Sequence, residues 1–135
     1  MDILRVLIVD DSRTIRSLAR VFLDHENIAV TEAVDGYEGL SLFQQSKPDI
    51  VFVDVLMPRL DGHKFCAIAK ANHLTAGTPI YMLTSKSSVI DRARSALLQA
   101  DGFITKPFKR ADLQAVLSRH FPRFANALLE KEARA

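Results

Sequence analysis

The chain has 135 residues and a mass of 15.1 kDa, which is the usual size of a single domain. Its composition, 48% hydrophobic and 25% charged, is too apolar for a disordered chain. The net charge of +2 is too small to indicate nucleic-acid binding, and no apolar run approaches the roughly 18 residues of a membrane-spanning helix. The start of the chain lacks a secretory-signal pattern and the single cysteine, Cys66, excludes an internal disulfide, so we expect a cytoplasmic protein.

Short apolar runs alternate along the chain with stretches in which apolar residues recur at helical spacing. The apolar runs predict strands at residues 3–9, 28–34, 49–53, 79–83 and 103–105. The helical spacing predicts helices over residues 15–23, 37–47, 62–72, 89–100 and 113–120. Ser12 is a candidate N-cap for the first helix, Pro48 ends the second, and Pro79 opens a strand at the position where its missing N–H does least harm.

This alternation predicts an α/β fold. Strands that are joined through a helix run parallel, and right-handed crossovers place helices on both faces of the sheet. Five strand–helix units are too few for a TIM barrel. We therefore expect an open, doubly wound sheet of five parallel strands flanked by five helices.

The sequence also indicates where the domain ends. Residues 1–120 hold the alternating pattern, and residues 121–135 form a short C-terminal tail. Pro122 ends the fifth helix, and the apolar residues at 124–129 can start another one. The tail is too short for a DNA-binding or catalytic domain. It is a linker cut from a longer protein, a dimerisation helix or a frayed end.

Polar side chains follow the predicted strands, at the carboxyl ends where open α/β sheets bind their ligands. Asp10 and Asp11 follow the first strand, Asp54 the third, Thr84 and Ser85 the fourth, and Lys106 the fifth. Because parallel strands end at the same edge of a sheet, we expect three carboxylates, hydroxyls and an ammonium group to lie close together there.

Three ionised carboxylates in one cleft repel one another unless one is protonated or a cation lies among them. Oxygen ligands suit Mg²⁺ (or Mn²⁺), whereas the scattered histidines and lone cysteine do not suit zinc. A metal ion, a lysine and a hydroxyl are the groups that hold a phosphoryl group. The remaining carboxylate can act as a nucleophile and form an aspartyl phosphate. We choose Asp54, which stands alone on the central strand, and assign Asp10 and Asp11 to the metal.

Together these residues resemble the response-regulator receiver domains, the CheY-like family. The resemblance is carried by residues 9–12 (Val-Asp-Asp-Ser), 54–62 (Asp-Val-Leu-Met-Pro-Arg-Leu-Asp-Gly), Thr84 and residues 106–108 (Lys-Pro-Phe). These segments have the family's order and spacing over about residues 3–120, which makes the combination specific although each part alone is weak. The resemblance implies a flavodoxin-like sheet with strand order 2-1-3-4-5.

The resemblance also implies a role for each site residue. Asp54 is the phosphoacceptor, Mg²⁺ is held by Asp10 or Asp11, by Asp54 and by the main-chain carbonyl of Leu56, and Thr84 and Lys106 contact the phosphoryl oxygens. Phe103 is a ring that turns inward when Thr84 shifts toward the phosphoryl group. Pro58 and Gly62 shape the loop after the phosphoacceptor, and the Lys106–Pro107 peptide bond is expected to be cis.

The function that the resemblance implies is that of a two-component or phosphorelay response regulator, a signalling phosphoacceptor and not an enzyme. A histidine kinase or a histidine phosphotransfer protein supplies the phosphoryl group. The face formed by the fourth helix, the fifth strand and the fifth helix then switches the binding of a downstream protein. We expect no direct contact with nucleic acid and no membrane insertion, and a homodimer stays open.

Other functions need residues that this chain lacks. A phosphatase of the haloacid-dehalogenase type has a second acid two residues after its nucleophile, where Leu56 stands. A flavodoxin-like cofactor site needs a phosphate loop rich in glycine and hydroxyls, and a dinucleotide site needs the G-x-G-x-x-G motif. The alternative that stays open is a receiver-like binding module that is not phosphorylated.

Some residues depart from the family pattern or keep two interpretations. Ser85 stands where the family usually has Ala or Gly, which narrows the phosphoryl pocket. Leu56 and Lys86 flank the route of an attacking water, and we expect apolar Leu56 to lengthen the lifetime of the phosphoryl group. Phe103 is either the switch ring or an ordinary core residue. Three arginines share one face of the first helix and form either a solvated surface or a docking patch for an acidic partner: Arg13, Arg16 and Arg20.

Overall fold

The structure is a computed structural model that describes residues 2–85 and 100–134. Its strands are β1 (Leu4–Val9), β2 (Ile28–Ala33), β3 (Ile50–Asp54), β4 (Ile80–Ser85) and β5 (Gly102–Lys106). Its helices are α1 (Arg13–Phe22), α2 (Gly36–Ser46), α3 (Gly62–Ala71), α5 (Arg110–His120) and α6 (Pro122–Arg134). The fourth helix predicted over residues 89–100 lies outside the described residues except for Ala100.

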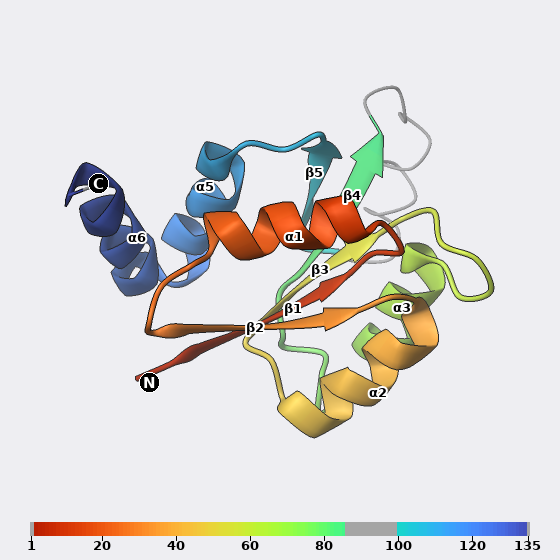
Figure 1. The fold of residues 1–135 in the computed structure, drawn as a ribbon. Coiled ribbons are helices and arrows are strands. Elements are labelled where there is room, and N and C mark those ends of the chain that lie inside the picture. The colour runs from red at the N-terminus through yellow and green to blue at the C-terminus, as the bar shows by residue number, and fades with distance from the viewer. Residues whose placement is uncertain (1, 86–99, 135) are drawn as a thin grey trace.

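The five strands form one parallel sheet in the order β2-β1-β3-β4-β5. Helices α1 and α5 cover one face of this sheet, and α2 and α3 cover the other (Figure 1). The prediction of a doubly wound, five-stranded parallel sheet in the order 2-1-3-4-5 is therefore confirmed. The central strand β3 is buried along its whole length, as expected of a strand that is covered on both faces.

The strands divide their side chains between two hydrophobic cores, because successive residues of a strand point to opposite faces. On β1, Val6 and Ile8 pack into the core under α1 and α5, whereas Leu7 and Val9 pack into the core under α2 and α3. The helices pack on the two faces of the sheet, so the carboxyl ends of the strands are covered by loops. The polar residues of these loops therefore meet at one edge.

Side-chain caps set the start of the helices that flank this edge. The Ser12 hydroxyl accepts the Ile15 N–H at 3.3 Å at the start of α1, as expected. Asp35 and Asp61 cap α2 and α3 in the same way, at 2.8 Å and 2.9 Å. The caps fix the junctions at which the chain leaves the sheet edge and enters each helix.

Residues 122–134 form helix α6, which packs against α5. Phe124 and Leu128 are buried in the same core as residues of β1 and β3. The ammonium group of Lys131 donates to the Asp24 carbonyl at 2.7 Å and pairs with the Asp24 carboxylate at 3.0 Å. The tail is thus a packed helix in the structure, while the domain division at residue 120 stays a prediction.

Two adjacent leucines of α6 test this packing. Leu128 is 5% exposed and Leu129 is 48% exposed. We expect Leu128→Ala to lower the free energy of unfolding by roughly 2–5 kcal/mol, since it opens a cavity in the core. The matched change Leu129→Ala should cost about 0.5 kcal/mol or less. Urea unfolding of both variants measures the difference, and equal losses would contradict the packing of α6.

Candidate functional site

The carboxyl edge of the sheet brings the predicted acids together. Asp10 follows β1, Asp54 ends β3, and carboxylate oxygens of Asp10, Asp11 and Asp54 lie within 4.8 Å of one another. Asp10 and Asp54 are buried, whereas Asp11 is exposed. Within the described part of the chain no other group of three or more histidines, cysteines or acids has ligand spacing.

Lys106, at the end of β5, joins two of these acids. Its ammonium nitrogen lies 2.9 Å from Asp54 Oδ1 and 3.4 Å from Asp10 Oδ2. Burial lowers the pKa of Lys106, but the hydrogen bond and charge of Asp54 and the charge of Asp10 outweigh it and leave the pKa above its ordinary value. The lysine is therefore a firmly charged partner of both carboxylates. The Lys106–Pro107 peptide bond is cis.

The pKa values of the two buried carboxylates, Asp54 and Asp10, are both raised. Burial raises the pKa of Asp54 to about 6; the charge of Asp10 also raises it, and the hydrogen bond from Lys106 opposes the rise. Burial likewise raises the pKa of Asp10. Among the described residues one ammonium group faces the three carboxylates, so their charges sum to an excess of negative charge at neutral pH. An all-oxygen donor set with this charge fits a hard divalent cation such as Mg²⁺.

The chain turns back over the Asp54 carboxylate directly after β3. The Leu56 N–H lies 3.4 Å from Asp54 Oδ1, which places the main chain of Leu56 beside the acids. The Leu56 side chain is 70% exposed and points away from the core. Lys86, the second residue that was expected to flank a water route, lies outside the described residues.

Thr84 lies on β4, one residue beyond the register partner of Asp54. It is buried, and its hydroxyl oxygen has no hydrogen-bond partner among the residues that the structure describes. Buried hydroxyls nearly always have a partner, so an orphan at this edge indicates a place for an additional acceptor. The neighbouring Ser85 is exposed.

Phe103 is 40% exposed on β5, opposite Met82 of β4. The interpretation of Phe103 as an ordinary core residue is therefore wrong for this conformation. An exposed ring on the last strand of the sheet has the starting position that an inward switch requires, and the switch itself stays a prediction.

Gly62 starts α3 against the carbonyl of Asp54. A Cβ atom at residue 62 would lie 2.4 Å from that carbonyl oxygen, so only glycine allows this approach. The Gly62 N–H donates to the Val55 carbonyl at 3.0 Å, and the Leu60 N–H donates to the Pro58 carbonyl at 2.9 Å. The loop from 55 to 61 is thereby folded tightly next to Asp54.

Sequence reasoning missed how this loop is anchored. Arg59 adopts a positive φ of 69° and pairs with Asp35 at 2.7 Å. Its guanidinium also lies 5.5 Å from the centre of the Tyr37 ring. Asp35 caps α2, so the pair ties the loop to the helix that precedes β3. The repeated Asp-Gly at 35–36 and 61–62 indicates where the two helices start. It gives no indication that Arg59 pairs with Asp35.

The arginine face of α1 differs from both sequence interpretations at Arg16. Arg16 and Arg20 each form an ion pair with Glu32 of β2, at 3.1 Å and 2.8 Å. The Arg16 side chain is only 13% exposed, so neither a solvated surface nor a docking patch describes it. Arg20 is about half exposed, and Arg13 is exposed.

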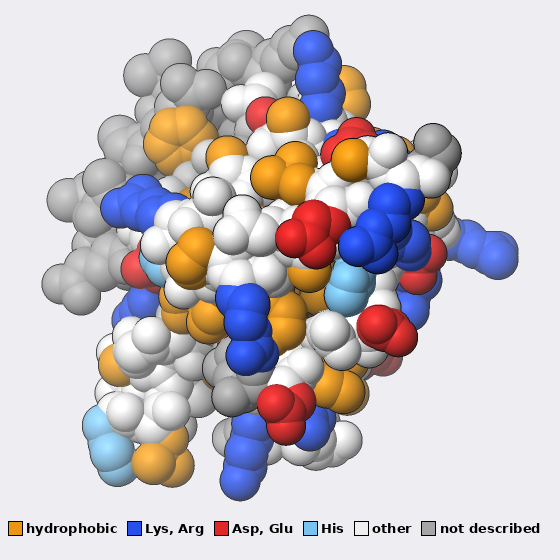
Figure 2. Space-filling view, turned by 90° about the vertical axis from the view of Figure 1, so that its left-hand side faces the viewer, with side chains coloured by type: hydrophobic (Ala, Val, Ile, Leu, Met, Phe, Trp, Pro, Cys, Tyr) orange, Lys and Arg blue, Asp and Glu red, His pale blue; other side chains and the backbone are white. Residues whose placement is uncertain are grey.

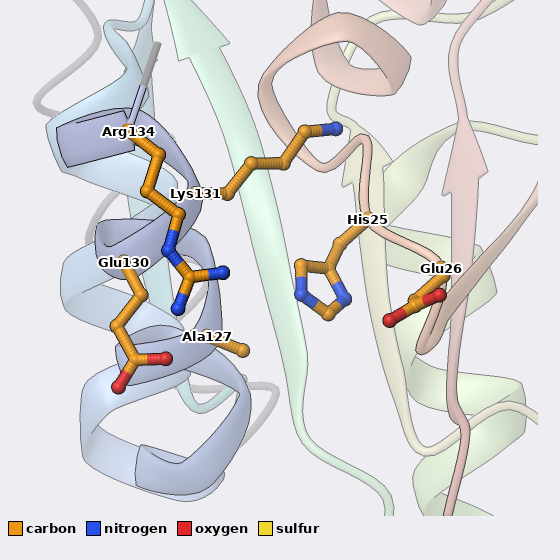
Figure 3. Close-up of a pocket in the computed structure, with 6 residues that line it drawn as sticks. All are labelled: His25, Glu26, Ala127, Glu130, Lys131 and Arg134. Atoms are coloured by element: carbon orange, nitrogen blue, oxygen red, sulfur yellow. The ribbon is translucent and has the colours of Figure 1, made fainter.

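A separate hollow lies between α6 and the turn from α1 to β2 (Figure 3). It has a volume of about 340 Å³ and its lining includes two acids, Glu26 and Glu130, and two basic residues, Lys131 and Arg134. His25 projects into it from the turn. The opposite charges offset each other, so the hollow does not favour an ion of either sign.

The surface shows no large patch of one charge on the face seen in Figure 2, where basic and acidic side chains are interspersed. This distribution agrees with the small net charge of +2. Among the described helices, none has the length and apolar character needed to span a membrane.

Comparisons with known proteins identify the family. The model of the response regulator receiver domain matches residues 6–118. The protein PilG of Pseudomonas aeruginosa is 39% identical over 123 residues, which cover 91% of each chain. The probable transcriptional regulator ycf27 of Guillardia theta is 40% identical over 111 residues, which are 82% of this chain and 42% of that protein. The chain therefore spans less than half of that longer regulator.

Solved structures agree with the sequence relatives. The chemotaxis protein CheY4 of Vibrio cholerae superposes with a TM-score of 0.80 and 32% identity, over 87% of this chain and 98% of that one. A putative response regulator from Chloroflexus aurantiacus gives a TM-score of 0.82 with 28% identity, over 87% and 96% of the two chains. With the acids, the threonine and the lysine gathered at one edge of the same sheet, the chain belongs to the response-regulator receiver domains of two-component signalling.

Proposed function

We propose that the protein accepts a phosphoryl group on Asp54 from a histidine kinase or a histidine phosphotransfer protein. The observation that carries the proposal is the contact of the Lys106 ammonium with both Asp54 and Asp10, beside a third carboxylate. Segments far apart in the chain meet there in a geometry that suits phosphoryl transfer and that no structural need of the sheet explains. The protein is a phosphoacceptor of this kind rather than an enzyme acting on free substrates.

The hydrogen bonds around Asp54 leave one oxygen available for attack. Among the described residues, the Leu56 N–H and the Lys106 ammonium both contact Oδ1. Oδ2 is then the nucleophile that attacks phosphorus. As the new O–P bond forms, the P–N bond of the donor phosphohistidine breaks, and the histidine keeps the electron pair and takes up a proton. Lys106 is placed to neutralise charge on the transferred group.

Asp10, Asp11, Asp54 and the main-chain carbonyl of Leu56 are the residues that would hold Mg²⁺ or Mn²⁺. When bound, the metal ion supplies positive charge that offsets the carboxylates and the phosphoryl oxygens. Burial raises the pKa of Asp54 to about 6 even though the hydrogen bond and charge of Lys106 lower it, so Lys106 helps to keep the carboxylate ionised for attack. Asp10 is held in place by its acceptance of the Ser12 N–H at 2.8 Å.

The added phosphoryl group carries roughly −2 charge and three strong acceptor oxygens. The Thr84 hydroxyl, which has no partner among the described residues, then gains an acceptor, which draws the end of β4 toward Asp54. A change from a mostly inactive to a mostly active population needs about 3–5 kcal/mol. A few charge-assisted hydrogen bonds of about 1.5–3 kcal/mol each supply that free energy.

We propose that β5, α5 and the fourth helix, which lies outside the described residues, form the output face for a downstream protein partner. Phe103 is exposed on β5 and belongs to this face. A kinase that uses ATP works in the cytoplasm, so we place the protein there. The alternative is a receiver-like module that binds partners without phosphorylation, and no observation favours it. The phosphoryl-uptake experiment below distinguishes the two functions.

The first test is phosphoryl uptake. Incubated with Mg²⁺ and acetyl phosphate or phosphoramidate, the protein should gain one phosphoryl group in its intact mass, and Asp54→Asn should gain none because its amide is not a nucleophile. The matched control Asp24→Asn changes an exposed acid of the α1–β2 turn and should be labelled like the wild type. Label on Asp54→Asn would contradict the assignment, and an unlabelled wild type would favour the binding module.

The raised pKa of Asp54 predicts a pH-dependent stability. Its folded-state pKa is about 6 against an ordinary value of 3.8, so between these values the unfolded chain releases the proton first and the folded state loses stability as the pH rises. Without metal, Asp54→Asn should be more stable than the wild type at pH 8, by on the order of 1–3 kcal/mol. Urea unfolding should show that this advantage shrinks at pH 4; a constant advantage would rule out the raised pKa.

The exposed side chain of Leu56 predicts a slow loss of the phosphoryl group. Leu56→Asn replaces an apolar screen beside Asp54 by a group that can hydrogen-bond an attacking water, so we expect several-fold faster dephosphorylation. Leu74→Asn is the matched control, because Leu74 is also exposed but lies in the loop between α3 and β4. The decay of the phosphorylated mass with time measures both rates. Equal rates for Leu56→Asn and the wild type would sink the hypothesis.

A further inference from the structure

Arg16 connects three segments of the chain next to the acidic edge. Its Nη1 donates to the main-chain carbonyl of Asp10 at 2.8 Å, and its Nε pairs with Glu32 Oε1 of β2 at 3.1 Å. The side chain is 13% exposed, which is low for an arginine at the start of an amphipathic helix. Helix α1, the end of β1 and the edge strand β2 are thus joined by one guanidinium group.

The peptide group that Arg16 contacts belongs to a residue of the acid cluster. Asp10 is fully buried, its N–H donates to the Ala33 carbonyl at 3.1 Å, and its Oδ1 accepts the Ser12 N–H at 2.8 Å. The hydrogen bond from Arg16 fixes the carbonyl on the other side of the residue. Both peptide groups of Asp10 are therefore held, and with them the direction in which its carboxylate leaves the main chain.

The guanidinium itself is held from the opposite side. Glu32 accepts from Arg16 through one oxygen and from Arg20 through the other, at 3.1 Å and 2.8 Å. The two arginines together lower the pKa of Glu32 against the effect of its partial burial, so this carboxylate stays ionised. Arg20 also donates to the Val30 carbonyl at 3.0 Å, which is on the sheet edge and far from Asp10.

Such a support matters because the acids repel one another. Oxygens of the three carboxylates lie within 4.8 Å of one another, and without a metal ion the part of their repulsion that Lys106 does not offset pushes the β1–α1 loop away from Asp54. A contact to the main chain of Asp10 resists this displacement without occupying the ligand oxygens. Groups that orient metal ligands in this way commonly change metal affinity about 10–100-fold when they are removed.

We propose that Arg16 is a positioning residue for the metal site, held by Glu32, and that it keeps the Asp10 carboxylate aligned with Asp54 before any cation binds. This inference rests on the proposed function of the acidic edge. Arg16 touches neither the metal nor the phosphoryl group, so its effect is on metal affinity and on loop order, and not on the transfer step itself.

Arginine is required at this position because its planar fork reaches two acceptors at once. A lysine at residue 16 keeps the positive charge near the acids but can reach either the Asp10 carbonyl or Glu32, and not both in the observed geometry. Arg16→Lys is therefore a sharper variant than Arg16→Ala, since it separates geometry from charge. Arg20→Lys is the matched control: it alters a partner of the same Glu32 on the same helix without a contact to Asp10.

The experiment compares wild type, Arg16→Lys and Arg20→Lys in three measurements. Calorimetric titration with Mg²⁺ gives the Kd of the unphosphorylated protein, amide exchange of Ser12 in the metal-free protein reports the order of the loop, and phosphoramidate labelling at saturating Mg²⁺ gives the transfer rate. For Arg16→Lys we expect a Kd about tenfold higher, faster Ser12 exchange and a transfer rate close to wild type. Arg20→Lys should match the wild type in all three.

The outcomes separate this inference from the proposed function. If the wild type binds Mg²⁺ and is phosphorylated but Arg16→Lys and Arg20→Lys behave alike, the positioning role is overturned and the phosphoacceptor stands. If the wild type neither binds Mg²⁺ nor is labelled, both proposals fall. Glu32→Gln, which weakens the hold on Arg16 without changing α1, provides a second variant and should raise the Kd in the same direction as Arg16→Lys.

Discussion

The ammonium group of Lys106 between Asp54 and Asp10 is the interaction on which the rest of this edge depends. It joins β5, at the border of the sheet, to the two central strands, across 52 and 96 residues of chain. Among the described residues, the ammonium group of Lys106 does not balance the three carboxylates, so this part of the protein holds an electrostatically incomplete cluster. A bound cation offsets this excess, and it also offsets the roughly −2 charge that a phosphoryl group brings, so the charge count as well as the geometry supports the proposed function.

An incomplete cluster costs stability, and the two cores offset that cost. Burial raises the pKa of Asp54 and of Asp10, and Thr84 lies buried beside them with a partnerless hydroxyl among the described residues. Apart from exposed Arg5, the side chains of β1 are apolar and buried, and β3 is apolar and buried up to Asp54. The sheet therefore stabilises an edge that carries repelling carboxylates and a buried hydroxyl without a described partner. Unfavourable arrangements of this kind are concentrated at functional sites.

The architecture could be predicted from the sequence because it follows from two patterns of apolar residues, short continuous runs and helical spacing. Apolar runs at β1 and β3 and helical spacing in α1 and α2 determined a parallel sheet, and strand ends then placed Asp10, Asp54 and Lys106 at one edge. The bridges of Arg16 to Glu32 and of Arg59 to Asp35 could not be predicted, because they join charged residues 16 and 24 positions apart that single-sequence patterns assign to solvent. Their existence depends on the rotation of α1 and on the path of the loop after β3, which packing decides.

The same packing decides which part of the proposed output face is able to move. Helix α5 is held by α6 through buried Leu128, and its first residue, Arg110, lies 5.2 Å from the ring centre of Phe22 on α1. A shift of α5 would break contacts with two helices. Phe103 has a half-exposed ring on the neighbouring strand. The proposed signal from Thr84 to the Phe103 side chain therefore needs no displacement of α5.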